Sequence, residues 1–249
     1  GEGHRLTKAE AVNLFKIRDR SSFLIAAAAD ALREKKCGNA ITWVKNQNIN
    51  CSNLCVNTCG FCGFSCKPGD PKAYELTPED VGEKASLAAS RGVTEICTVS
   101  GLHPEYDLNS YLSIYQAIRE NAPGVHIHAS NPMEVAYAAR RSGCSTKEVL
   151  EAFRDAGVGT LCGTAAEILV DEIREVICPE KISTDEWVRI IKESHNSGLR
   201  STATIMYGHC DSVENQVEHL SILRDIQDET HGFMELVPLS FIPPGTPTY

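Results

Sequence analysis

The sequence lacks an excess of basic residues. Its 24 Lys and Arg are outnumbered by 33 Asp and Glu, which gives a formal net charge of -9 and a pI of about 5.4. A chain with this balance repels polyanions, so its composition argues against nucleic acid as the main partner. We therefore do not expect a nucleic-acid partner.

Long hydrophobic runs are also lacking. The longest run, FLIAAAADAL at 23–32, is interrupted by Asp30. It is too short to cross a bilayer, which takes about 20 apolar residues in a helix. The N-terminal stretch GEGHRLTKAE has no apolar core of the kind that a signal peptide needs. We therefore expect a cytoplasmic protein that does not contact membranes.

Cysteine, by contrast, is abundant. Eleven cysteines in 249 residues, without an export signal, indicate free thiols or metal ligands in a reducing compartment rather than disulfides. Four of them lie in the short stretch CSNLCVNTCGFC, at positions 51, 55, 59 and 62. Cys55, Cys59 and Cys62 form the spacing C-x3-C-x2-C, and Cys51 stands outside it.

Three thiolates on one loop are soft ligands that suit zinc or an iron-sulfur cluster. A structural zinc site usually joins two C-x2-C knuckles from separate hairpins, so a single loop favours the cluster. Three cysteines leave the fourth iron of a cubane open to a substrate or cofactor. Zinc with Cys51 or Cys66 as a further ligand, and unrelated core thiols, are the alternatives. Otherwise Cys51 and Cys66 are expected to be ordinary thiols near the site.

Short apolar runs alternate with amphipathic segments along the rest of the chain, which is typical of repeated βα units. We expect six strands, at 41–49, 93–99, 125–129, 158–161, 201–206 and 233–239. Right-handed crossovers would curl these units into an α/β fold, a partial (βα)6 TIM-like barrel. Functional residues should then follow the carboxyl ends of the strands.

Capping signals place several helices. Thr7 with Glu10 begins a helix within 6–18, Thr77 precedes Pro78 at the start of another, and Ser183 begins one that ends before residue 198. A further helix is expected at 21–36. Residues 1–39 would form an N-terminal helical lead-in, and 40–249 the barrel core.

The stretch CVNTCGFC, with Phe61 just before the last cysteine, resembles the signature of the radical SAM superfamily. The resemblance implies a 4Fe-4S cluster held by Cys55, Cys59 and Cys62. The remaining iron would chelate the amino and carboxyl groups of S-adenosylmethionine. An electron from the cluster would then split the sulfonium into methionine and a 5'-deoxyadenosyl radical, with Phe61 packed near the adenine.

Five further stretches resemble a narrower group, the enzymes of deazaflavin FO synthesis and their relatives in the futalosine route to menaquinone. They lie at 100–106, 126–135, 163–187, 202–209 and 219–241. GTAAEIL at 163–169 is similar to the FO synthase subunit that uses tyrosine, whereas menaquinone relatives have a Gly-Gly-Ala-Glu version. The resemblance implies transfer of the 4-hydroxybenzyl group of L-tyrosine to 5-amino-6-(D-ribitylamino)uracil. A futalosine enzyme, a paralogue without coupling activity and a non-catalytic zinc-stabilised barrel are the alternatives.

The same resemblance implies protein partners and a missing segment. An electron donor such as ferredoxin or flavodoxin would reduce the cluster, and the second FO synthase subunit would complete the synthesis of FO. The C-terminal part of the family would follow Tyr249 and is missing from this chain. The chain departs from the family pattern at Ser100, Ser130, Asn131, Cys162 and Asp211, positions expected to flank the pocket.

The resemblance also implies cofactor-binding residues beyond the cysteines. Backbone groups at Ser100 and Gly101 would take the methionine ammonium, unless Gly101 serves only the φ of a tight turn. Glu167, expected at the start of a helix, would bind the ribose or the ammonium, unless it only complements the helix N-terminus.

Four residues are candidates for lining the substrate pocket: His103, His128, Tyr207 and His209. His128 shares one strand face with His126, because side chains two apart in a strand point the same way. Structural histidines, loop-fixing hydrogen bonds and ordinary packing are the alternatives for these residues. Asp225 and Asp228 are expected on a solvated helix face rather than at a metal site.

Overall fold

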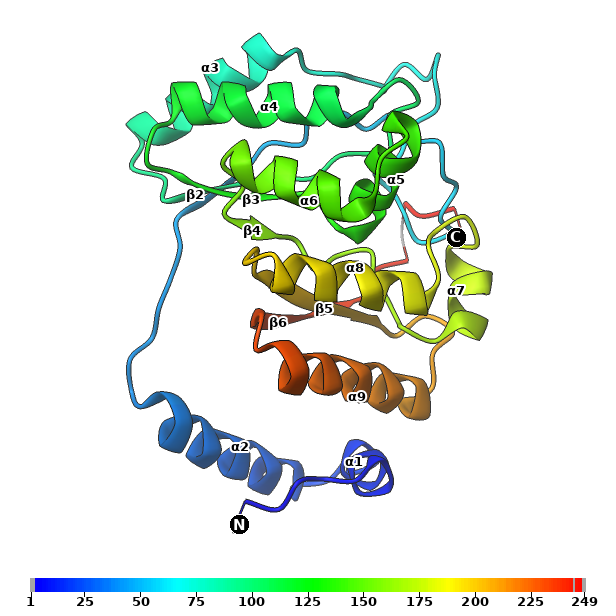
Figure 1. The fold of residues 1–249 in the computed structure, drawn as a ribbon. Helices are drawn as coiled ribbons and strands as arrows, with labels where there is room; N and C mark the ends of the chain where they lie inside the picture. Colours follow the sequence, from blue (N-terminus) through cyan, green and yellow to red (C-terminus); the bar gives the residue numbers. More distant parts are fainter. Residues whose placement is uncertain (1–2, 244, 248–249) are drawn as a thin grey trace.

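The computed structural model describes residues 3–243 and 245–247. In these residues six parallel strands form one sheet in the order β1-β2-β3-β4-β5-β6, and helices follow the strands along the chain (Figure 1). The strands are β1 (Asn46–Asn48), β2 (Glu95–Thr98), β3 (His126–Ala129), β4 (Thr160–Leu161), β5 (Ser201–Tyr207) and β6 (Phe233–Ser240). Because every strand pairs with its neighbours in the chain, the sheet curls as the predicted partial barrel does, and the predicted fold class is confirmed.

Local sequence signals explain where several helices begin. Thr7 and Thr77 each form a capping box, with Glu10 and Asp80 as the third helical residues, and the Ser183 hydroxyl accepts a hydrogen bond from the amide of Glu186. The helices are α1 (Lys8–Phe15), α2 (Ser22–Cys37), α3 (Pro78–Ser90), α4 (Leu108–Asn121), α5 (Pro132–Ser142), α6 (Thr146–Asp155), α7 (Asp171–Ile177), α8 (Thr184–Asn196) and α9 (Val213–Thr230).

The hydrophobic core lies between the sheet and the helices on its outer face. Along β2 and β3, Ile96 and Ile127 are buried in this core, whereas the residues that alternate with them are only half-buried. Rings from α4 and α6 fill the space, with Tyr115 edge-on to Phe153 at a centroid distance of 5.1 Å. The alternation leaves a separate, more polar inner face on the sheet.

The first strand is much shorter than predicted. The sequence favours a strand over 41–49, but β1 covers only Asn46–Asn48, and Ile41, Trp43 and Val44 are exposed. Backbone pairing with the β2 region begins only at Lys45, whose carbonyl accepts from Thr94. An apolar run therefore lies in an extended connection here, because no neighbouring strand or helix covers it.

Helix α1 and the residues that flank it contact the barrel through α9. Three ion pairs join this segment to α9: Arg5 with Asp228, Lys8 with Glu218 and Lys16 with Glu214. The charged face of α9 is therefore partly paired with the N-terminal segment rather than simply solvated.

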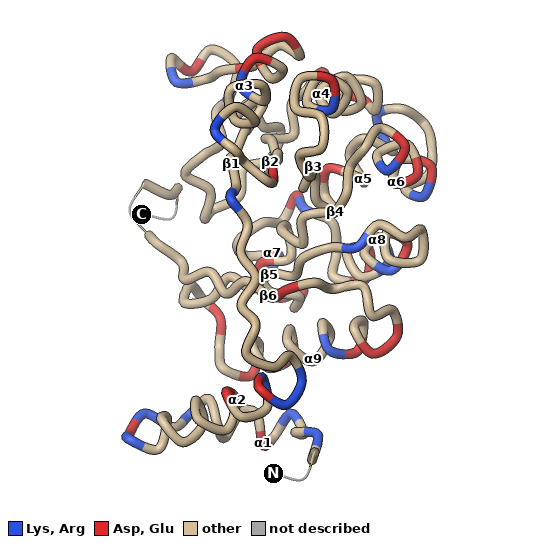
Figure 2. Tube along the Cα trace, turned by 90° about the vertical axis from the view of Figure 1, so that its left-hand side faces the viewer, with Lys and Arg blue, Asp and Glu red and all other residues tan. Residues whose placement is uncertain are grey.

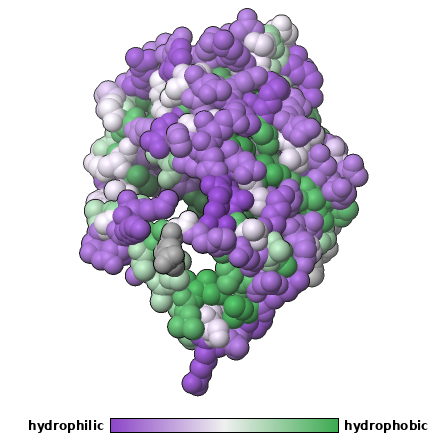
Figure 3. Space-filling view, turned by 60° about the horizontal axis from the view of Figure 1, so that its bottom comes forward, coloured by the Kyte–Doolittle hydropathy of each residue, from purple (hydrophilic) through white to green (hydrophobic). Residues whose placement is uncertain are grey.

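Helix α2 has no buried residue, and Phe23 and Leu24 are exposed. Figure 3, in which the α1–α2 end comes forward, shows hydrophobic surface on that side. The division into a lead-in at 1–39 and a core at 40–249 stays a prediction.

Residues of both charge signs are spread along the helices and connecting loops (Figure 2). In the part of the chain that the structure describes, no helix combines the length and the apolar composition needed to cross a membrane.

Replacing Phe153 with alanine is expected to destabilise the fold. Its side chain is fully buried, so Phe153→Ala should lower the free energy of unfolding by about 3–5 kcal/mol through lost transfer energy and an unfilled cavity. Phe23→Ala is the matched control, because Phe23 is 75% exposed and its loss should change the stability by less than about 0.5 kcal/mol. Urea unfolding with unchanged m-values measures both. Equal effects would contradict the assignment of the core.

Candidate functional site

The three cysteines of the C-x3-C-x2-C motif line one cavity at the carboxyl ends of the strands. The loop from β1 supplies the cysteines, and the loops after β2, β3 and β4 supply the opposite wall. The lining residues are Cys55, Asn57, Cys59, Phe61, Cys62, Phe64, Ser65, Ser100, Gly101, Leu102, Asn131, Met133, Glu134, Ala165 and Lys181. We call this the cysteine cavity. It brings together the predicted cluster ligands, Phe61, Ser100 and Gly101, but not Glu167.

Backbone contacts fix the cysteine loop against the loop after β2. The amide of Gly101 donates to the carbonyl of Ser52 at 2.9 Å. The amide of Val56 donates to the carbonyl of Leu102 at 3.0 Å. A Cβ atom at Gly101 would lie 2.3 Å from the carbonyl oxygen of Leu54. The alternative that Gly101 serves only the φ of a tight turn is therefore excluded, because its φ is not positive. The glycine is required instead by the close approach of the two backbones.

The three sulfurs lie in different surroundings. Cys55 Sγ accepts a hydrogen bond from the amide of Leu102 at 3.4 Å. Burial raises the pKa of Cys59 to about 12, although the nearby Lys181 ammonium acts in the opposite direction. Without a cation, the Cys59 thiol keeps its proton. A metal would have to displace that proton on binding.

Lys67 holds the first turn of the cysteine loop. Its ammonium donates to three successive carbonyl oxygens, those of Cys55 at 2.9 Å, Val56 at 2.9 Å and Asn57 at 3.0 Å. These contacts orient the backbone between the first two cysteines.

Glu134 is a buried acid in the wall of the cavity. It is 2% exposed, and its carboxylate accepts from the amide of Ser100 at 3.2 Å and from the Asn131 side chain at 2.8 Å. Burial raises the pKa of Glu134 to about 8, and the two hydrogen bonds only partly oppose this. The carboxyl group links the start of α5 to the loop that carries Ser100 and Gly101.

Glu167 lies in a loop rather than at the start of a helix, because α7 begins only at Asp171. Both Ala165 and Glu167 have positive φ, at 64° and 45°, which is uncommon for residues with side chains. The buried Arg174 guanidinium donates to the carbonyls of Ala165, Ala166 and Ile182 and holds this strained loop. The first-turn explanation of Glu167 is therefore wrong.

Glu167 forms a buried ion pair with Lys181. Burial opposes ionisation of Glu167, but Lys181 and Arg174 together hold the pKa of this carboxyl below its usual range. Lys181 also lies 5.1 Å above the centre of the Phe61 ring, a cation–π contact. Lys181 thus connects Glu167 to the wall of the cysteine cavity.

Cys51 and Cys66 lie beside the cavity and do not line it. Cys51 is fully buried with its sulfur 3.3 Å from the Thr98 hydroxyl, and burial raises its pKa to about 11. Cys66 Sγ accepts from the Asn53 amide group at 3.3 Å. Each thiol therefore already has a structural hydrogen-bond partner.

The four candidate pocket residues are dispersed. His103 is buried outside the cysteine cavity, with its ring 4.5 Å from that of Tyr106. His209 lines a second cavity that lies on the other side of Phe61, and Tyr207 is exposed at the end of β5. Their roles in substrate binding stay predictions.

His126 and His128 do share one face of β3, and this is the inner face of the sheet. His126 Nε2 and His128 Nδ1 each lie 2.8 Å from the hydroxyl oxygen of Thr160 on β4. Burial lowers the pKa of His128, so its ring is neutral at physiological pH.

Three residues of the cavity region carried no signal in the sequence. Glu134 follows an asparagine cap and resembles an ordinary first-turn acid, and only its burial distinguishes it. Lys67 lies close to the motif in the sequence, but lysine is not one of the residue types that the motif contains. Lys181 lies more than 100 residues after the motif. Their contacts arise from loop geometry that no periodicity encodes.

Comparison with protein families gives one match to this region. Residues 49–222 match the family described as the radical SAM superfamily. The matched segment begins just before the cysteine loop and extends into α9.

Curated relatives match over nearly the whole chain. A 5-amino-6-(D-ribitylamino)uracil–L-tyrosine 4-hydroxyphenyl transferase of Methanospirillum hungatei JF-1 is 88% identical, with 100% of this chain and 68% of the relative covered. A protein of the same name from Methanoculleus marisnigri is 66% identical, with 99% and 67% covered. The chain thus spans about two thirds of the length of these relatives.

A solved structure, that of the methylornithine synthase PylB, has the same fold. It matches with a TM-score of 0.78 and 21% identity, over 99% of this chain and 68% of that protein. At this identity the likeness concerns the fold alone.

Removal of the Lys67 ammonium is expected to loosen the cysteine loop. Lys67→Met loses three charge-assisted hydrogen bonds, which together should stabilise the loop by roughly 1–3 kcal/mol, so less iron should remain bound after anaerobic reconstitution and gel filtration. Lys72→Met, at an exposed lysine five residues on, is the control. Equal iron contents in the two variants would refute a role for Lys67 in holding the loop.

Ionisation of Glu134 is expected to lower the stability as the pH rises. Its folded-state pKa of about 8 lies above the ordinary value, so between about pH 4.5 and 8 the folded state retains a proton that the unfolded chain loses. The free energy of unfolding should fall over this window by at most about 1.4 kcal/mol per pH unit. Glu134→Gln should remove this slope, and the exposed Glu83→Gln should not. Parallel urea melts from pH 5 to 8 check this, and identical slopes in all three proteins would contradict it.

Proposed function

The chain belongs to the radical SAM superfamily, and within it to the 5-amino-6-(D-ribitylamino)uracil–L-tyrosine 4-hydroxyphenyl transferases, and from this membership we propose its reaction. The 4-hydroxybenzyl group of L-tyrosine is joined to C5 of 5-amino-6-(D-ribitylamino)uracil, in the biosynthesis of the deazaflavin FO. The by-products are 2-iminoacetate, methionine and 5'-deoxyadenosine. The observation that carries the proposal is the cysteine cavity, in which the three motif thiols meet Phe61 and the loop at Ser100.

The donor set fits a 4Fe-4S cluster with one iron free of protein ligands. Cys55, Cys59 and Cys62 reach one cavity from a single loop, and no fourth cysteine of residues 3–243 or 245–247 lines it. Thiolate sulfurs are the ligands that such clusters take. The Lys181 ammonium near Cys59 lowers the cost of forming the anionic sulfur that ligation requires there.

Several residues of this chain would bind the cofactor. When bound, the cluster and S-adenosylmethionine supply a 5'-deoxyadenosyl radical. Phe61 offers an apolar ring face in the cavity, and the carbonyl groups of Ser100 and Gly101 are suited to accept from an ammonium group. Glu167, kept ionised by Lys181, can accept from a hydroxyl or ammonium group at the edge of the site.

The inner face of the sheet is suited to the two polar substrates. The ribityl and uracil groups need many hydrogen-bond partners, and His126 and Thr160 offer them on β3 and β4, beside the predicted pocket residue His128. Tyr207 ends β5 and His209 lies two residues beyond it, at the same carboxyl edge, where they can contact tyrosine or the uracil. His103, buried against Tyr106, would act on the pocket by fixing the loop after β2.

Two protein partners would complete the activity. An electron donor such as ferredoxin or flavodoxin would deliver the electron to the cysteine cavity. The second FO synthase subunit would take the coupled product to FO.

Activity should require both substrates and the cysteine loop. Anaerobic incubation of the iron-loaded chain with tyrosine, the diaminouracil, S-adenosylmethionine and a reductant should give the coupled product and 5'-deoxyadenosine, detected by mass spectrometry. Cys59→Ala should abolish both, whereas Cys144→Ala, at a thiol outside the cavity, should retain them.

Two results would count against the proposal. Formation of 5'-deoxyadenosine without a coupled product would show that the substrates are wrongly assigned. Turnover of a futalosine-type substrate in place of tyrosine would assign the chain to the menaquinone route.

A further inference from the structure

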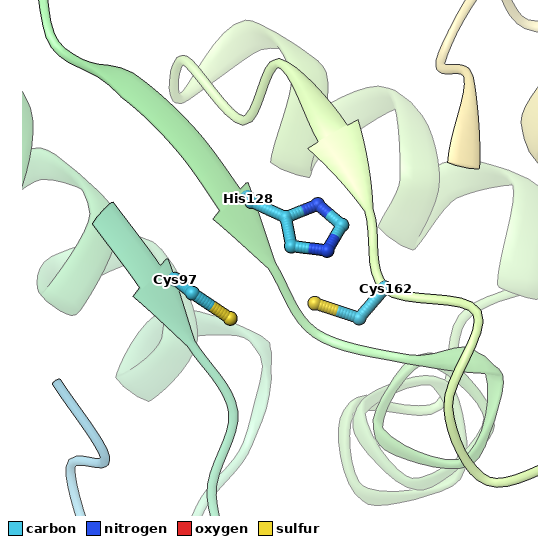
Figure 4. Close-up of side chains that lie close together, drawn as sticks. All are labelled: Cys97, His128 and Cys162. Atoms are coloured by element: carbon cyan, nitrogen blue, oxygen red, sulfur yellow. The ribbon is translucent and has the colours of Figure 1, made fainter. Parts of the chain in front are cut away.

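A second group of metal-ligating side chains lies on the inner face of the sheet. Cys97 on β2, His128 on β3 and Cys162 just after β4 point toward one another from three neighbouring strands (Figure 4). One ligand atom of each lies within 4.8 Å of the others. None of the three residues lines the cysteine cavity.

The strand register explains why these residues meet. Cys97 pairs with His128 across β2 and β3, and His128 pairs with Thr160 across β3 and β4. Cys162 lies two residues beyond Thr160, so it falls on the same side of the sheet. The grouping is thus fixed by regular backbone pairing rather than by a flexible loop.

We propose that Cys97, His128 and Cys162 bind a thiophilic divalent cation, Zn²⁺, as a site separate from the cysteine cavity. Two thiolates and one imidazole are a ligand set that zinc prefers. The Zn–S distance is then about 2.3 Å and the Zn–N distance about 2.0 Å. Ligand atoms then lie roughly 3.5–4 Å apart, which small side-chain rotations reach from the present arrangement. Three protein ligands leave a fourth position for water or for a nitrogen or oxygen donor of a small molecule.

The histidine is already held in a ligating orientation. His128 Nδ1 lies 2.8 Å from Thr160 Oγ1, and the same hydroxyl oxygen lies 2.8 Å from His126 Nε2. If Nδ1 carries the proton and donates to Thr160, the Nε2 lone pair is free for a metal. A partner that fixes the second ring nitrogen in this way accompanies nearly every metal-binding histidine.

The Cys162 thiol is buried, and burial raises its pKa well above the usual range. Binding of a cation would therefore have to displace the proton of this thiol.

The test uses the chain with Cys55→Ala, Cys59→Ala and Cys62→Ala, so that the motif thiols cannot compete. Anaerobic titration with Co²⁺ should give one equivalent of binding with thiolate-to-cobalt charge-transfer absorption, and Zn²⁺ should displace it. Adding Cys97→Ser or Cys162→Ser should weaken binding at least tenfold. Cys144→Ser, at a half-buried thiol outside the group, should leave binding unchanged.

A second measurement does not depend on folding of the triple variant. Elemental analysis of the iron-loaded wild-type chain after exposure to Zn²⁺ should give one zinc per chain, lost in Cys162→Ser and retained in Cys144→Ser. Two results of the cobalt titration would overturn the proposal: no binding, or absorption that survives Cys97→Ser. A third would be the finding that Cys97 and Cys162 react with an alkylating reagent only after reduction, because they would then form a disulfide rather than a metal site. This test is independent of catalytic activity, so its failure would leave the proposed transferase reaction untouched.

Discussion

The close approach of the Gly101 backbone to the Leu54 carbonyl is the constraint on which the site depends. This contact joins the cysteine loop after β1 to the loop after β2. Two backbone hydrogen bonds, from Gly101 to Ser52 and from Val56 to Leu102, fix the spacing of the two loops. Any side chain at Gly101 would push the cysteine loop away from the wall that carries Glu134. The parallel sheet makes this contact possible, because it delivers the ends of successive strands to one edge.

The two faces of the sheet carry different kinds of buried residues. The outer face is covered by helices and filled by residues such as Ile96, Ile127 and Phe153, where burial of apolar surface stabilises the fold. The carboxyl edge and the inner face instead carry buried polar groups, among them Glu134 and the Glu167–Lys181 pair. Burying such groups and holding Ala165 and Glu167 at positive φ costs free energy, which the packed outer face must offset.

The sequence predicted the regular parts of the molecule well, because capping residues and alternating apolar runs are local signals. Thr7, Thr77 and Ser183 begin the helices they were expected to begin, and six parallel strands follow in chain order. The errors lie where tertiary contacts decide. The run at 41–44 has no neighbouring strand to pair with, and the loop around Glu167 is held by Arg174 rather than by helix geometry. The need for glycine at position 101 comes from the Leu54 carbonyl, which is far away in the sequence. The spacing identified the motif cysteines, but the burial of Glu134 and the alignment of Cys97 with His128 required the folded chain.

The measurement that tests the assignment of the cysteine cavity most directly is EPR of the reduced, anaerobically reconstituted chain with and without S-adenosylmethionine, on the wild type and on Cys55→Ala. A 4Fe-4S signal that shifts on addition of S-adenosylmethionine and disappears in Cys55→Ala is the expected result. Bound zinc in place of iron at the motif cysteines, or a cluster signal indifferent to both S-adenosylmethionine and Cys55, would contradict it.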